Sequence, residues 1–203
     1  MSVSIMGVVG AGKSTLCNYL TEESGIVLFP EPVETNPYLT KFYEEPSSYA
    51  FQMQCFLLLQ RFKQMQEAEN HTMYLMDMGL WGNDIFAKLM WTNLDITDTD
   101  YETYLDLSAT LKSLVKPPKL TVYLHCRPEV SVGRVLKRGR PAELNASNKY
   151  WYDLYREYEN WYQNYDAGAK LMIDVSDIDI VNNMKERQEV MDEIYATYDL
   201  IAN

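Results

Sequence analysis

A glycine-rich segment near the N-terminus constrains the fold of this chain more than any other feature. Residues Gly7-Val8-Val9-Gly10-Ala11-Gly12-Lys13-Ser14 follow the apolar run Val3-Ser4-Ile5-Met6 and match the phosphate-binding pattern G-x-x-x-x-G-K-[ST]. Glycine is needed there because successive backbone N–H groups turn inward around phosphate oxygens, along a path that a Cβ would obstruct. The segment therefore predicts a strand, a phosphate loop and a helix that together bind a nucleoside triphosphate.

Individual residues of the loop have predicted tasks. The helix after the loop points its positive end at the phosphates, and Lys13 reaches the β- and γ-phosphates. The Ser14 hydroxyl is a ligand for Mg²⁺. The residues expected to bind ATP here are Gly7, Gly10, Ala11, Gly12, Lys13, Ser14 and Thr15.

Composition limits what surrounds this loop. The 203 residues are 47% hydrophobic, which suits one compact domain spanning 1–203. A net charge of −11 repels polyanions, so duplex DNA or RNA is an unfavourable partner, whereas a small nucleotide in a local cationic pocket is compatible. Neither a membrane span nor a signal peptide is recognisable, and we expect a cytoplasmic protein. The three cysteines and two histidines lack metal-ligand spacing and are interpreted as structural.

Short β-rich runs alternate with helical patterns along the whole chain. This alternation predicts an α/β fold of the P-loop NTPase type, with a five-stranded parallel sheet flanked by helices. The strands are expected near 2–8, 26–30, 73–77, 119–126 and 170–175, and the helices near 13–23, 46–69, 79–92, 100–115, 128–137, 146–165 and 180–200.

Acidic residues follow two of these strands, at the sheet edge where ligands of such folds collect. Glu31 lies between Pro30 and Pro32, which fix the local backbone, and it suits a general base for a phosphoryl acceptor hydroxyl. Asp77 ends the third strand, where many phosphate-loop enzymes hold an acid for Mg²⁺. For each carboxylate, an exposed residue without a role in chemistry is the alternative.

Two further groups of polar residues suggest ligand contacts. Gln54 and Arg61 lie seven residues apart on one face of a predicted helix, about 10 Å apart along its axis, where they could read a base edge or serve as buried structural groups. The segment 133–143 is the densest cationic stretch and contains Arg134, Arg138 and Arg140. Converging guanidinium groups are what phosphoryl transfer requires, although a solvated basic helix end would have the same composition.

Together these residues resemble the deoxynucleoside kinases, specifically the bacterial and phage branch related to deoxyadenosine and deoxyguanosine kinases. The resemblance covers nearly the whole chain. It is carried by the phosphate loop, by Glu31-Pro32-Val33-Glu34-Thr35-Asn36-Pro37-Tyr38, by Phe42-Tyr43-Glu44-Glu45-Pro46, by Gln54 with Arg61, and by the stretch from Arg134 to Glu143 followed by Tyr150.

The resemblance implies an ATP- and Mg²⁺-dependent kinase, expected as a homodimer, that phosphorylates the 5′-hydroxyl of a deoxynucleoside. Glu31 would deprotonate that hydroxyl, and Lys13, Arg138 and Arg140 would be the other catalytic residues, at the phosphates. The remaining implied contacts are Tyr43 and Glu143 at the 3′-hydroxyl of the sugar; Gln54 and Arg61 at the base, with Asn83 or Asp84 beside Arg61; Tyr150 elsewhere at the substrate; Arg134, Arg138 and Arg140 at the phosphates, with a lid near 138–146; Asp174, Val175, Ser176 and Asp177 beside the adenine of ATP; and Ser14 with Asp77 at Mg²⁺.

The chain departs from the family pattern at two places. The family carries an arginine after the acid of the third strand, beside the base carboxylate, and this chain has Met78 there. The acid that pairs with the base-reading arginine is replaced by Asn83, with Asp84 as a substitute after a shift of one residue. Base preference therefore stays open, although Arg61 favours purines over thymine because it fills space and donates to purine acceptors.

Two other functions stay open at the level of sequence. A thymidylate-type nucleoside-monophosphate kinase shares the loop, sheet and lid, but it needs extra arginines for its acceptor phosphate rather than a carboxylate base. A nucleotide-binding protein that has lost catalysis would account for Met78.

Overall fold

The computed structural model describes residues 1–22, 25–33, 35–140, 143 and 146–202. The chain divides into two compact units. A sheet unit comprises Met1–Pro30, His71–Met78 and Pro118–Asn203, and a helical unit comprises Glu31–Asn70 and Gly79–Pro117.

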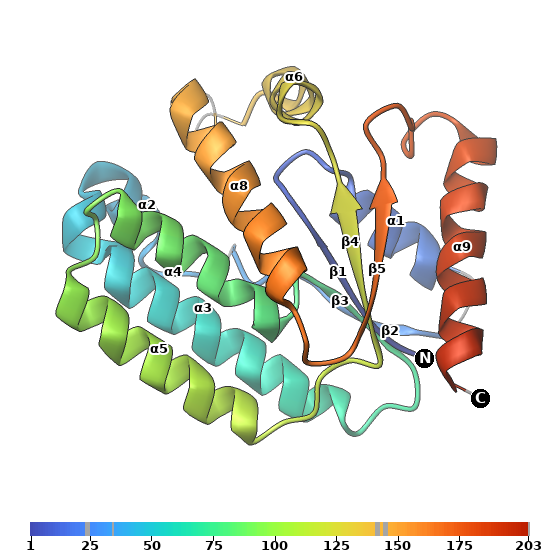
Figure 1. Cartoon of the computed structure of the whole chain (residues 1–203), viewed down its shortest axis with the longest axis horizontal. Coiled ribbons are helices and arrows are strands. Elements are labelled where there is room, and N and C mark those ends of the chain that lie inside the picture. Colours follow the sequence, from blue (N-terminus) through green and yellow to red (C-terminus); the bar gives the residue numbers. More distant parts are fainter. Residues whose placement is uncertain (23–24, 34, 141–142, 144–145, 203) are drawn as a thin grey trace. The chain divides into compact units, whose positions relative to one another are not determined.

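All five predicted strands are present, and they form one parallel sheet in the order β2-β3-β1-β4-β5 (Figure 1). The central strands are almost completely buried, which explains why they read as continuous apolar runs rather than as alternating patterns. The strands are β1 (Ser2–Gly7), β2 (Val27–Phe29), β3 (Tyr74–Asp77), β4 (Leu120–His125) and β5 (Ala169–Asp174).

Helices cover both faces of this sheet, so the predicted α/β class is confirmed (Figure 1). Helix α1 packs beside α9 and against β1, β2 and β3, whereas α8 covers the face from which Tyr123 points, with Tyr158 stacked on that ring. Local signals set the helix ends: Pro128 starts α6, Gly139 ends it in a left-handed conformation, and Ser147 caps α8. These helices are α1 (Lys13–Thr21), α6 (Pro128–Arg138), α8 (Asn148–Asn164) and α9 (Met184–Ala202).

The helical unit is built around α3, a 23-residue helix that starts at a proline. Its neighbours α4 and α5 pack on α3 and on each other, and Thr97 caps α5 by accepting a hydrogen bond from the Asp100 N–H at 3.1 Å. The elements are α2 (Leu39–Glu44), α3 (Pro46–Ala68), the short 3₁₀ helix η1 (Leu80–Gly82), α4 (Asn83–Thr92) and α5 (Asp98–Ser113).

The structure corrects one predicted boundary in this unit and adds one helix that the sequence did not predict. The helix expected over 79–92 begins only at Asn83, because residues 80–82 form a 3₁₀ turn. Helix α2 was not predicted at all. It has six residues, lacks a side-chain cap and packs on α3, so tertiary contacts rather than a local signal stabilise it.

Among the described residues, every helix is too short or too polar to cross a membrane.

Candidate active site

The phosphate loop has the backbone geometry that its glycines suggested. Gly10 and Gly12 adopt φ angles of +85° and +95°, which side-chain-bearing residues rarely adopt. A Cβ on Gly10 would also lie 2.7 Å from the Ser131 carbonyl oxygen of α6, so backbone is packed closely against the loop. Lys13 begins α1 and donates from Nζ to the Val8 carbonyl at 3.2 Å, which folds the side chain back over the loop. A phosphate would thus meet inward N–H groups, a helix N-terminus and a lysine.

The two residues predicted to hold Mg²⁺ contact each other. Ser14 Oγ donates to Asp77 Oδ2 at 2.5 Å, and Asp77 is buried at the end of β3. Asp77 Oδ1 is buried without a hydrogen-bond partner among the described residues. A buried carboxylate oxygen without a partner is unfavourable unless a ligand satisfies it, so the pair fits Mg²⁺, which takes few protein ligands and completes its shell with water and phosphate.

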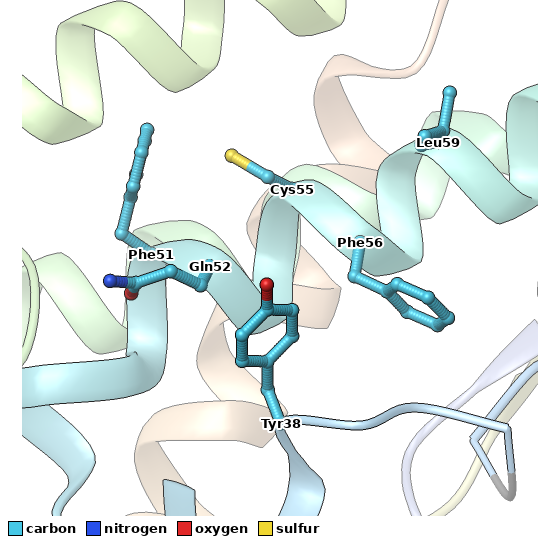
Figure 2. Close-up of a pocket in the computed structure, with 6 residues that line it drawn as sticks. All are labelled: Tyr38, Phe51, Gln52, Cys55, Phe56 and Leu59. Atoms are coloured by element: carbon cyan, nitrogen blue, oxygen red, sulfur yellow. The ribbon is translucent and has the colours of Figure 1, made fainter.

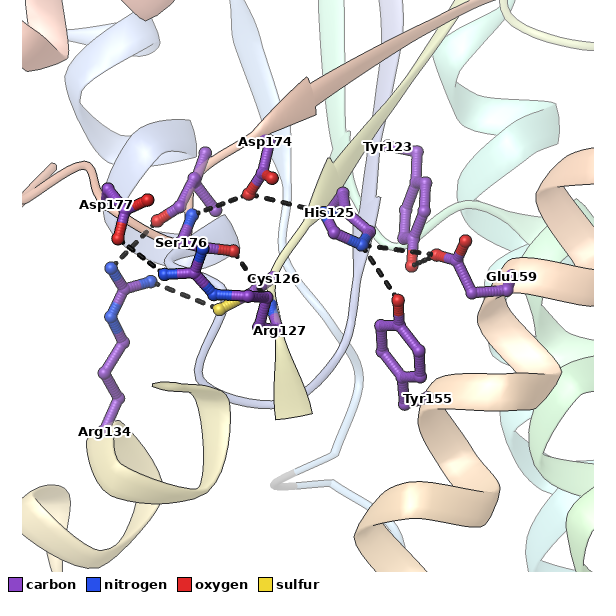
Figure 3. Close-up of polar contacts among 11 residues, drawn as sticks. Tyr123, His125, Cys126, Arg127, Arg134, Tyr155, Glu159, Asp174, Ser176 and Asp177 are labelled. Carbon is purple, nitrogen blue, oxygen red and sulfur yellow. Dashed lines mark hydrogen bonds and ion pairs between the residues drawn. The ribbon is translucent and has the colours of Figure 1, made fainter. Parts of the chain in front are cut away.

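The cationic segment after β4 has a different arrangement from the phosphate clamp predicted for it. Arg134 donates from Nη2 to the carbonyl oxygens of Val175 and Ile178, at 2.9 and 2.8 Å, and from Nη1 to Cys126 Sγ at 3.6 Å (Figure 3). The guanidinium therefore ties α6 to the loop after β5. That loop contains the residues that the sequence associates with the adenine of ATP.

A second set of contacts at the same edge of the sheet holds that loop from the other side. His125 ends β4, and its Nδ1 lies 3.3 Å from Asp174 Oδ1 at the end of β5 (Figure 3). Asp174 also accepts a hydrogen bond from the Ser176 N–H at 2.9 Å. Burial opposes ionisation of Asp174, but the hydrogen bonds from Ser176 and His125 outweigh it and lower the pKa of that carboxyl. The spacing of His125 predicts only a structural role and does not indicate this contact.

The predicted lid near 138–146 lies partly outside the described residues, which omit 141, 142, 144 and 145. Within the described part, Arg138 Nη2 donates to both carboxylate oxygens of Glu143 at 2.7 Å. Arg140 Nη1 lies 3.7 Å from the same carboxylate. Both lid arginines thus pair with Glu143, the residue predicted to hold the sugar.

In the helical unit, the base-reading arginine contacts the predicted general base. Arg61 is 2% exposed, and its Nη2 donates to Glu31 Oε1 at 2.7 Å. Its Nη1 donates to Asn83 Oδ1, and Asn83 Nδ2 donates to the Tyr104 hydroxyl at 2.5 Å. Asn83 therefore takes the place beside Arg61 at which the resemblance implies an acid.

Asp84 does not take that place. Its two carboxylate oxygens accept hydrogen bonds from Ser108 Oγ at 2.6 Å and Lys112 Nζ at 2.5 Å, both on α5. The alternative in which Asp84 pairs with Arg61 does not describe this structure, because Asp84 fastens α4 to α5.

Gln54 and Arg61 are both buried on α3, as the apolar face predicted. Gln54 Nε2 donates to the weak acceptor Met90 Sδ at 3.2 Å. Gln54 Oε1 and Arg61 Nε are buried without partners within the part of the chain that the structure describes. A ligand that donates to Gln54 Oε1 and accepts from Arg61 Nε would satisfy both atoms.

The remaining predicted residues lie in different units. Tyr43, on α2 of the helical unit, is 51% exposed and packs on Phe42. Tyr150 lies in the first turn of α8 in the sheet unit, where its ring packs on Trp151. Thr15 is in the first turn of α1. The predicted contacts of these residues with substrate stay predictions.

Met78, at the position where the resemblance implies an arginine, has a constrained environment. It is buried, its φ is +65°, and its Sδ accepts a hydrogen bond from the Tyr158 hydroxyl at 3.8 Å. A non-glycine residue in the left-handed region is uncommon and strained, so surrounding contacts must hold this backbone in place.

Comparison with known proteins agrees with this geometry. A family model described as "Deoxynucleoside kinase" matches residues 3–198. A deoxyadenosine/deoxycytidine kinase of Bacillus subtilis is 31% identical over 196 residues, which cover 95% of this chain and 90% of that protein. A deoxyguanosine kinase of Lactobacillus johnsonii is 32% identical over 206 residues, covering 96% and 91%.

Solved structures give the same result. The deoxyadenosine kinase from M. mycoides with bound dATP superimposes with a TM-score of 0.85 at 31% identity, covering 96% of this chain and 100% of that one. Because the family model spans almost every residue and relatives above 30% identity cover nearly the whole chain, this protein belongs to the deoxynucleoside kinase family.

Proposed function

We propose that this enzyme transfers the γ-phosphoryl group of ATP, with Mg²⁺, to the 5′-hydroxyl of a purine deoxynucleoside. The observation that carries the acceptor assignment is that two buried atoms, Gln54 Oε1 and Arg61 Nε, have no hydrogen-bond partner among the residues that the structure describes. A purine edge can present a donor to Gln54 Oε1 and an acceptor to Arg61 Nε. Because both atoms are buried, leaving them without hydrogen bonds costs free energy that a bound base recovers. Relatives named for deoxyadenosine and deoxyguanosine support the same class.

The roles of the residues follow from their chemistry. Glu31 accepts the proton of the 5′-hydroxyl, and Lys13 stabilises charge on the transferring phosphoryl group. Ser14 and Asp77 hold Mg²⁺, which neutralises phosphate charge when bound. In the lid, Arg138 and Arg140 leave the carboxylate of Glu143 and bind phosphate oxygens instead. Glu143 is then able to contact the sugar. Tyr43 and Tyr150 are the other proposed contacts with the deoxynucleoside.

The structure favours a different role for Arg134, because two of its N–H groups already bind backbone carbonyls. It holds the loop of Val175 in position for the donor base, and Asp174 anchors the start of that loop. We propose that the chain acts as one kinase domain, located in the cytoplasm where ATP and Mg²⁺ are supplied.

An ADP-release assay with the four deoxynucleosides and their four monophosphates tests this function. The proposal requires turnover with deoxyadenosine or deoxyguanosine and much less with monophosphates. Turnover with thymidine monophosphate alone would instead identify a thymidylate-type kinase, and no turnover with any acceptor would identify a nucleotide-binding protein without catalysis.

Replacing Gln54 tests base recognition. We expect Gln54→Ala to lower kcat/KM for the preferred purine, with a loss of transition-state stabilisation of about 1–3 kcal/mol, because the base edge loses its partner in a buried site. Steady-state kinetics with purified protein measures this. Gln66→Ala, an exposed amide on the same helix, is the matched control and should change little. The highest kcat/KM for thymidine, or insensitivity to Gln54, would refute the assignment.

We also propose that the protein is a homodimer that pairs through α3. A groove on this helix is lined mainly by apolar side chains, and Figure 2 shows Phe51, Gln52, Cys55, Phe56 and Leu59 of α3 with Tyr38. Leu59 is 42% exposed despite its size. A second copy suits such a surface, because a two-fold axis lets one apolar patch cover its own equivalent.

Leu59→Glu should convert the dimer to monomers, because it places a charge in the apolar groove. Size-exclusion chromatography with light scattering would then report a fall from roughly twice the 23.7 kDa chain mass to the chain mass itself. Lys63→Glu, an exposed position on the same helix, should leave the dimer intact. A monomeric wild-type protein, or a dimeric Leu59→Glu variant, would contradict this pairing.

A further inference from the structure

Arg61 is a buried cation with two unequal neighbours. Its Nη2 donates to the carboxylate of Glu31 at 2.7 Å, and its Nη1 donates to the amide oxygen of Asn83. Asn83 is neutral and supplies only a dipole, so Glu31 provides the compensating charge. A buried charge is stable only with a counter-ion in good hydrogen-bond geometry, so Arg61 and Glu31 strongly favour staying in contact.

Asn83 connects Arg61 to two other helices of the same unit. Asn83, at the start of α4, accepts from Arg61 and donates to Tyr104 on α5. Burial raises the pKa of Tyr104 well above its usual value, so this hydroxyl stays neutral and the chain of hydrogen bonds is intact across the working pH range. These contacts support the guanidinium from one side and leave its Nε for a further contact that a bound base can supply.

The contact leaves Glu31 able to act. Arg61 engages Oε1, while 30% of the Glu31 side chain remains exposed. Arg61 also has N–H groups left for a ligand, including the buried Nε, which has no hydrogen-bond partner within the described part of the chain. One guanidinium therefore touches the proposed proton acceptor on one side and offers donors for a nucleobase on the other.

We propose that Arg61 is a positioning residue for Glu31 and that it couples recognition of the base to the orientation of the proton acceptor. This inference rests on the proposed function, in which Glu31 receives the proton of the 5′-hydroxyl. A base that satisfies the remaining donors of Arg61 locks the guanidinium and, through it, the carboxylate. The cognate base then raises kcat and does not merely lower KM.

A double-mutant cycle of Arg61→Met and Glu31→Gln tests the coupling, with kcat measured at saturating deoxynucleoside and ATP. Misplacing a catalytic group can cost on the order of 10²-fold, so Arg61→Met should lower kcat by about 30- to 100-fold when Glu31 is present. In the Glu31→Gln background the same change should lower kcat by less than about 3-fold, because residues that act as a unit are not additive. Arg61→Lys, which keeps the charge but not the guanidinium geometry, should lower kcat by less than Arg61→Met does.

Two controls separate this coupling from a loss of structure. Lys63→Met removes an exposed cation from the same helix and should leave kcat unchanged. Circular dichroism melts of all variants report folding, and Arg61→Gln enters the same cycle if Arg61→Met does not fold.

The outcomes separate this inference from the function on which it rests. Equal kcat losses from Arg61→Met in both backgrounds would overturn the coupling and leave Arg61 as a base contact alone. An unchanged kcat in Glu31→Gln would instead remove Glu31 as proton acceptor, and the proposed mechanism with it.

Discussion

Lys13→Ala is expected to abolish measurable turnover and to weaken ATP binding, while affinity for the deoxynucleoside stays largely intact. Lys13 begins α1 beside the phosphate loop, and we propose that its ammonium stabilises charge on the transferring phosphoryl group. Phosphoryl transfer relies on positioning and electrostatic stabilisation, so losing this cation affects the transition state as well as ATP binding. Initial rates, together with separate titrations of ATP and of deoxynucleoside, measure the effect.

Lys185→Ala is a suitable control for Lys13→Ala, because Lys185 is a lysine of the same unit with an 87% exposed side chain. It should match the wild type in both titrations. Equal loss of both affinities in Lys13→Ala would show that Lys13 supports the fold rather than the phosphates.

Glu31→Gln should lower kcat by roughly 10²-fold or more, the range for loss of a general base, and change deoxynucleoside binding by only a few-fold. The amide has the shape of the carboxylate and still accepts from Arg61, but it cannot take up the proton of a hydroxyl. Single-turnover and steady-state rates distinguish a slower chemical step from a slower product release.

Glu67→Gln, at an exposed position of α3, makes the same chemical change away from the proposed site and should leave kcat unaltered. A wild-type kcat for Glu31→Gln would exclude Glu31 from the mechanism. Carboxylate-dependent turnover would separate this enzyme from monophosphate kinases, whose acceptors are already ionised.

The fold was largely predictable because its determinants are local. Strand β4 follows two prolines and is a continuous apolar run, and the glycines of the phosphate loop mark the turn between β1 and α1. Such signals need no knowledge of distant residues. Helix α2 lacked them, because contacts with α3 rather than a cap or a long pattern stabilise it.

Pairings between distant residues were much less predictable. The spacing of Arg134, Arg138 and Arg140 suggested a common anion, yet Arg134 binds carbonyls of the loop after β5 and Arg138 binds Glu143. Asn83 and Asp84 were indistinguishable as partners of Arg61, because a shift of one residue at the start of a helix changes which side chain faces α3. Contacts between residues distant in the sequence were therefore harder to predict than the strands and helices that carry them.

Identification of the reaction product is the most direct test of phosphoryl transfer from ATP to a deoxynucleoside 5′-hydroxyl. Wild-type protein is incubated with ATP, Mg²⁺ and each purine deoxynucleoside, and the product is identified by mass spectrometry and ³¹P NMR. We expect the 5′-monophosphate of deoxyadenosine or deoxyguanosine together with an equal amount of ADP. ADP formed without a phosphorylated nucleoside, or a diphosphate formed only from an added monophosphate, would contradict it.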